Sequence, residues 1–185
     1  MVELIVVIAI IGLMLAIAIP YFGAVMRRSR VTAEARQILM PLLKARLEAI
    51  KRGNNVLVEI STNSIKTSYR QALVFVDTSN AGANLNVYDA GDTLIGTFPM
   101  APSSESTLRL DAVNAPSPST TSTTIDFIFT PFGSMDAATT SKAAYVSDAK
   151  NNVIQISVPS TSNGKPAMTK QLSASNYVAQ PWTWY

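Results

Sequence analysis

An uncharged apolar run near the N-terminus limits what this chain can fold into. No Asp, Glu, Lys or Arg occurs from Leu4 to Met26, and Leu, Ile, Val and Ala make up most of the run. At about 1.5 Å per residue, a helix of this length crosses a hydrocarbon layer about 30 Å thick. A secretory signal peptide has a shorter apolar core and ends at a small-residue cleavage site. The sequence therefore predicts a transmembrane helix over residues 1–26.

A second, basic helical stretch follows the apolar run without a break. Basic residues and then Gly53 follow its last apolar residue, as is typical of a helix C-terminus. We expect one helix from about Val2 to Arg52, which Pro41 bends without ending. Its apolar residues recur at steps of three and four, which predicts a single core-facing side. These residues are Ile38, Leu39, Leu42, Leu43, Leu47 and Ile50.

After Asn55 the spacing of apolar residues changes from about 3.6 to 2. Eight short runs rich in β-branched and aromatic residues, separated by Asn, Gly, Pro and Ser, indicate antiparallel strands. The predicted strands are 56–60, 69–76, 93–98, 108–113, 125–129, 143–147, 153–158 and 167–172. The predicted fold class is thus α+β, with a long N-terminal hydrophobic helix packed on an antiparallel β-sheet head. Its parts are the apolar half of the helix (1–26), the amphipathic half (27–53) and the β-rich head (54–185).

The composition leaves few routes to catalysis. The chain contains no Cys and no His, which excludes thiolate metal sites and His-dependent nucleophilic catalysis. No phosphate loop or dinucleotide fingerprint occurs. Asp89 and Asp92 lack the other ligands of a calcium loop, and we interpret them as part of a turn. We predict no enzymatic activity, no metal and no cofactor.

The charges are distributed unevenly. Residues 1–55 carry eight Lys/Arg against three Asp/Glu, whereas residues 56–185 carry seven against nine. The basic part adjoins the apolar run, so a solvated or headgroup-facing helix explains it more simply than a nucleic-acid surface. The head is net negative and its lysines are scattered, which argues against nucleic acid as a partner.

The segment from Val2 to Pro20 resembles the N-terminal segment of type IV pilins and type II secretion pseudopilins. In that superfamily a prepilin peptidase removes a short basic leader after a glycine, and the new N-terminus is methylated. By position, Glu3 corresponds to the glutamate at the fifth mature position, Gly12 to the mid-helix glycine and Pro20 to the helix-loosening proline. Because the glutamate is third here, we expect a leader and two further mature residues upstream of Met1.

The resemblance implies a structural subunit of a type IV pilus-like filament, extracellular or periplasmic. Its partners would be copies of itself or homologous pilins and, before assembly, the inner membrane and an assembly platform. It also implies that Glu3 neutralises a neighbour's N-terminal amine; the alternative is a hydrated Glu3 beside an ordinary membrane anchor. Gly12 and Pro20 weaken a helix, so we predict local unwinding between them in the assembled state, against the alternative of a simple kink.

Two further stretches indicate a particular group within this superfamily. Residues 43–56 and 125–133 are similar to GspH/FimT-type minor pilins, in which the helix leads directly into a strand and a Phe-x-x-x-Gly strand-turn occurs later. This similarity favours a minor pilin or a minor pseudopilin of a type II secretion system, and a DNA-binding minor pilin of an uptake pilus is a further alternative. We take a filament-forming subunit as the first hypothesis.

The C-terminus concentrates aromatic residues. Trp182, Trp184 and Tyr185 lie within the last four positions. They are either part of a last strand packed on the sheet or a contact for a neighbouring subunit. The sequence leaves both interpretations open.

Overall fold

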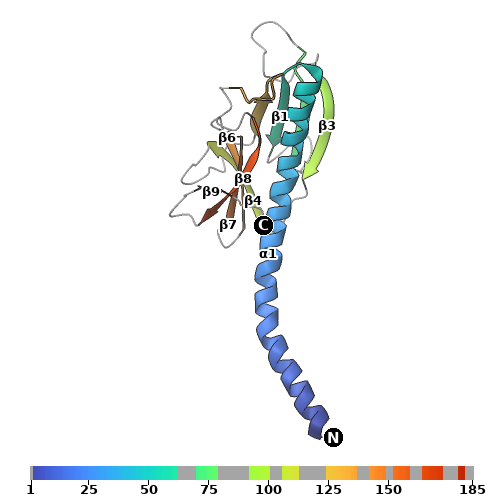
Figure 1. Cartoon of the computed structure of the whole chain (residues 1–185), viewed down its shortest axis with the longest axis vertical. Helices are drawn as coiled ribbons and strands as arrows, with labels where there is room; N and C mark the ends of the chain where they lie inside the picture. Colours follow the sequence, from blue (N-terminus) through green and yellow to red (C-terminus); the bar gives the residue numbers. More distant parts are fainter. Residues whose placement is uncertain are drawn as a thin grey trace.

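A computed structural model describes nine stretches of the chain. They are residues 2–61, 70–78, 92–100, 106–112, 124–136, 142–148, 152–158, 164–172 and 179–181, without the side chains of 18–21, 24, 106, 107, 112, 148, 152, 170–172 and 179–181. Within these residues one long helix precedes nine strands, which form two antiparallel sheets. Figure 1 shows the C-terminal half of the helix lying against the strands and the N-terminal half projecting away from them.

The helix, α1 (Val2–Arg52), has the extent that the sequence predicts. It runs through Gly12 and Pro41 without a break, so unwinding near Pro20 stays a prediction for the assembled state. Gly53 ends it with a φ of 68°, and the Gly53 N–H donates to the Ala49 carbonyl over 2.9 Å. Glycine adopts this left-handed conformation at little cost, which explains the predicted C-terminus.

The strands divide into two sheets. The first has the order β3-β2-β1-β5 and the second the order β4-β6-β7-β8-β9. The bounds are β1 (Val56–Ser61), β2 (Arg70–Val76), β3 (Thr93–Met100), β4 (Ser106–Ala112), β5 (Thr124–Phe129), β6 (Lys142–Asp148), β7 (Asn152–Ser157), β8 (Ala167–Leu172) and β9 (Ala179–Pro181). All eight predicted strands are present with ends within two residues. The ninth, β9, lies just before the aromatic C-terminus, where a last strand was one of two interpretations left open. The structure divides the predicted antiparallel strands between two sheets. Strand patterns specify which residues are buried but not which strands pair, so the sequence did not give this division.

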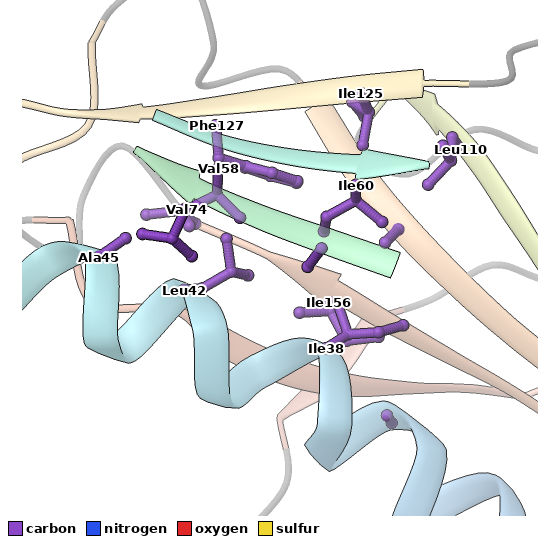
Figure 2. Packing of buried hydrophobic residues seen from close by; sticks show 14 of the residues in the cluster. Ile38, Leu42, Ala45, Val58, Ile60, Val74, Leu110, Ile125, Phe127 and Ile156 are labelled. Carbon is purple, nitrogen blue, oxygen red and sulfur yellow. The ribbon is translucent and has the colours of Figure 1, made fainter. Parts of the chain in front are cut away.

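One side of α1 packs against both sheets. Figure 2 shows Leu42 and Ala45 directed toward Val58 and Val74 of the first sheet, and Ile38 beside Ile156 of the second. The buried helix residues recur at steps of four and three, as a single helical face requires. They are Val31, Ala35, Ile38, Leu42, Ala45 and Ala49, and Pro41 beside them is buried as well.

The core-facing side of α1 differs from the predicted one at its C-terminal end. Leu47 and Ile50 were assigned to the core, but they are 67% and 49% exposed. Ala45 and Ala49 are fully buried in their place. The small side chain of alanine lets a helix backbone approach a sheet closely. A sequence pattern based on large apolar side chains does not identify such alanines as core residues.

A tight turn after β5 is hydrogen-bonded to α1. The Thr130 N–H donates to the Ser134 carbonyl and the Gly133 N–H to the Thr130 carbonyl, both over 2.8 Å. Arg46 of α1 donates from Nε to the Gly133 carbonyl over 2.9 Å. The turn therefore holds the C-terminal part of α1 against the end of β5.

Two glycines make this junction possible. Gly133 has a φ of 73°, and a Cβ there would meet Cδ1 of Ile50 at 2.6 Å. Gly164, just before β8, has a φ of 77°, and a Cβ there would overlap the backbone of Gly133 and Ser134. The close approach of the β5 turn and the segment before β8 therefore requires glycine at 164, and the left-handed backbone at 133 favours glycine there.

We expect Gly164→Ala to destabilise the head by about 3 kcal/mol. The left-handed backbone and the overlap with a rigid backbone both oppose a side chain there. Gly53→Ala is the matched control, because Gly53 is also left-handed but a Cβ there meets nothing within 4 Å. Its expected cost is only about 1 kcal/mol. Chemical denaturation measures both variants, and equal losses would contradict the close contact at Gly164.

Candidate assembly surface

The projecting half of α1 exposes apolar side chains around its circumference. From Val2 to Ile17 the large apolar side chains are 50–75% exposed, and Phe22, Val25 and Met26 continue the exposed surface. A helix that is apolar on all sides is normally buried in a protein core, a membrane or an assembly. We call residues Val2–Met26 the stem.

Glu3, Gly12 and Pro20 all belong to the stem and lie at separate levels along it. Glu3 lies in the first turn of α1 and is exposed. A Cβ at Gly12 would meet nothing within 4 Å, so no contact inside the chain requires glycine there. Pro20 lies within α1, and its side chain is not described. Their predicted roles concern contacts between subunits and stay predictions.

Trp182, Trp184 and Tyr185, the predicted subunit contacts at the C-terminus, lie outside the described residues. Their role stays a prediction.

The sequence predicted that residues 1–26 cross a membrane. Within its described residues, the structure contains no helix that is both long enough and apolar enough for this.

The head contains one unusual pair of acidic residues. Glu59 of β1 and Asp126 of β5 are cross-strand partners, and Glu59 alternates with the core residues Val58 and Ile60, so it faces away from α1. Burial raises the pKa of Glu59, and the nearby Asp126 raises it further. Burial also raises the pKa of Asp126, against the opposing effect of Lys142. The pair therefore carries an electrostatic cost when both carboxyls are ionised. Among the described residues there is no group of three or more Asp or Glu side chains that could hold a metal ion.

The sequence interpretation missed one exposed residue of the head. Phe132 is 91% exposed at the tip of the turn after β5. The sequence placed it only within a strand-turn similarity. Its position between Pro131 and Gly133 was the available signal, because Pro and Gly favour a turn whose tip reaches solvent.

A protein-family model and a solved structure are similar to this chain. The family model described as Type II transport protein GspH matches residues 34–162. No curated protein matches the chain. Among solved structures, the crystal structure of the type IV minor pilin FimU from Pseudomonas aeruginosa (strain PAO1) is similar. It is 12% identical, the match covers 83% of this chain and 94% of that chain, and the TM-score is 0.48.

The opposed carboxyls in the head predict a pH-dependent stability. A carboxyl with a raised pKa in the folded state holds its proton more tightly there than in the unfolded chain. Its stabilising contribution is complete below the ordinary pKa values, 4.5 for Glu59 and 3.8 for Asp126, and is lost as the pH rises through the folded values. We therefore expect Glu59→Gln to stabilise the head at about pH 7, by about 0.5 kcal/mol, and to have little effect at about pH 3.

Thermal unfolding of the detergent-solubilised chain measures this difference. In an Asp126→Asn background the pH dependence of the Glu59→Gln effect should shrink, because the neighbouring charge is gone. An equal change of the melting temperature at both pH values would contradict the predicted electrostatic cost.

Proposed function

The chain belongs to the GspH family of type II transport proteins, and from this premise we propose that it is a structural subunit of a pilus or pseudopilus filament. The match covers the C-terminal part of α1 and most of the head. The membership confirms the similarity that residues 43–56 and 125–133 indicated. Family members of this kind are structural proteins rather than enzymes.

The exposed apolar stem is the observation that supports filament assembly most directly. Its described large apolar side chains are largely exposed in the single chain, so another molecule would have to cover them to remove them from water. Burial of apolar surface contributes about 25 cal/mol per Å², and many side chains of this size provide a strong driving force. Stems of several copies, packed side by side, would bury this surface and leave the heads outside.

Head-to-tail contact explains why such packing would produce a filament rather than a closed oligomer. When each copy uses one surface to bind a different surface of the next, and the rotation does not close, an open helical array forms. In this arrangement Glu3 would lie among apolar stems, where a carboxylate requires a cationic partner. We propose that a neighbouring subunit's N-terminal amine supplies it. The inner-membrane stage before assembly, which the resemblance implies, belongs to the same proposal.

The filament is an extracellular pilus or a periplasmic pseudopilus, and one observation favours the second. The matching family is described by its part in type II transport, which supports a minor pseudopilin of a type II secretion system as the second candidate. A DNA-binding minor pilin has no comparable support among the described residues of the head.

A charge placed on the stem should prevent assembly. Leu13 is 68% exposed, so Leu13→Lys should leave the fold and melting temperature of the head unchanged. Burying the new ammonium group among apolar stems costs several kcal/mol, and each 1.4 kcal/mol lowers an association constant about tenfold. Electron microscopy and quantification of sheared filaments should therefore show a loss of at least about tenfold. Ser29→Lys, at an exposed position beyond the stem, is the control, and normal filaments from Leu13→Lys would refute assembly through the stem.

Glu3 provides a second, independent test. Glu3→Gln keeps the size of the side chain but removes the charge that would neutralise a neighbour's amine. We expect filaments to be absent or shortened, with the amount of protein in the cell envelope unchanged. Glu48→Gln is the matched control, because it removes only a surface ion pair with Arg52 over 2.8 Å, which contributes little. Filaments of normal number and length from Glu3→Gln would exclude the proposed pairing.

A further inference from the structure

The strand β3 gives the first sheet an open edge. Among the described strands it pairs only with β2, so main-chain N–H and C=O groups on its other side face away from the sheet. In the view of Figure 1, β3 lies on one side of α1 and the second sheet on the other. Thr93, Thr97 and Pro99 are exposed, and Leu94 is 51% exposed, so this edge is accessible to solvent.

The protection that β3 carries against further pairing is partial. Natural edge strands are protected by charged side chains, by proline or by bulges. β3 contains no Asp, Glu, Lys or Arg. Its register with β2 shifts between Leu94 and Gly96, and Pro99 lacks an N–H group. Neither feature removes a donor from Gly96, Thr97 or Phe98, so another strand can still form a ladder there.

Gly96 leaves space for a cationic group beside this edge. A Cβ at Gly96 would lie 3.7 Å from Nζ of Lys44, and the same Nζ is 5.1 Å from the centre of the Phe98 ring. Gly96 is the cross-strand partner of the core residue Val74, so Gly96 and Phe98 both face α1. The exposed Lys44 therefore places its ammonium group over the α1 side of β3, next to the open edge.

We propose that β3 binds an extended segment of another protein, which adds to the first sheet as a further strand and carries an acidic side chain opposite Gly96. Directly opposed residues of neighbouring strands have Cβ atoms about 4.5–5.5 Å apart. A Glu or Asp opposite Gly96 therefore comes within ion-pair distance of Lys44. An apolar side chain two residues away would face the Phe98 ring, since alternate residues share one side of a strand. Main-chain hydrogen bonds would supply affinity, and these two positions would supply specificity.

The geometry favours another protein over a second copy of the same edge. Two copies that joined through β3 of each would be related by a twofold rotation and would form a closed pair. Stems packed side by side in the proposed filament require an open array instead. β3 also has no acidic side chain of its own to place beside Lys44 of a second copy.

Peptide binding to the detergent-solubilised full chain tests this contact. The probe is the capped peptide Thr-Thr-Val-Thr-Glu-Thr-Val-Thr-Thr, which reads the same in both directions and so fits either strand orientation. We expect saturable binding that slows hydrogen exchange of β3 amides. A peptide with Lys in place of Glu should bind about fivefold more weakly or worse. Of two versions N-methylated at every second residue, the one whose methyl groups face β3 should not bind.

Variants of α1 show whether Lys44 recognises the acidic side chain. Lys44→Gln should bind the Glu and Lys peptides equally, with its melting temperature nearly unchanged because Lys44 is exposed. Lys51→Gln, about 10 Å further along α1, is the matched control and should keep the preference for Glu. A preference that persists in Lys44→Gln, or no binding of the Glu peptide to the unmodified chain, would overturn the inference.

Self-association provides a further test. Slowed exchange of β3 amides without peptide, increasing with protein concentration, would show that a second copy occupies the edge and would also overturn the inference. These measurements use dispersed chains rather than filaments, so a negative result leaves the proposed function standing.

Discussion

Close packing of one side of α1 against two sheets is the interaction on which the rest of the structure depends. Ala35, Ala45 and Ala49 are fully buried on this side, and their small side chains let the sheets reach the helix backbone. The larger Leu42 packs toward Val58 and Val74 of the first sheet and Ile38 beside Ile156 of the second, as Figure 2 shows. Because both sheets pack against the same side of α1, the described part of the head does not cover the opposite side.

The junction at Gly133 follows from the same constraint. The β5 turn and the segment before β8 come into contact near the C-terminal end of α1. A Cβ at 164 would overlap the backbone of Gly133 and Ser134, so glycine at 164 permits this contact. The Arg46 hydrogen bond to the Gly133 carbonyl then holds the turn against α1. The Phe-x-x-x-Gly similarity in the sequence thus has a physical cause, since its glycine lies under Ile50.

The two halves of α1 have different surroundings, and this difference connects the fold to the proposed function. From Val31 onward the helix is part of a folded head, whereas the stem satisfies its backbone internally but exposes its described apolar side chains. Such a surface is stable only when another apolar surface covers it. A filament of parallel copies would cover it.

Local pattern in the sequence determined the long helix, its end at Gly53 and all eight of the predicted strands, because hydrophobic period and glycine preference act over a few residues. It also determined the family, through the helix end and the β5 turn. Only the tertiary structure decided that the strands form two sheets, that Ala45 and Ala49 face the core, and that Leu47 and Ile50 face outward. Strand pairing and the depth of helix packing depend on contacts between residues far apart in the chain. A large apolar side chain looks the same in a sequence whether its own head or a neighbouring subunit will cover it.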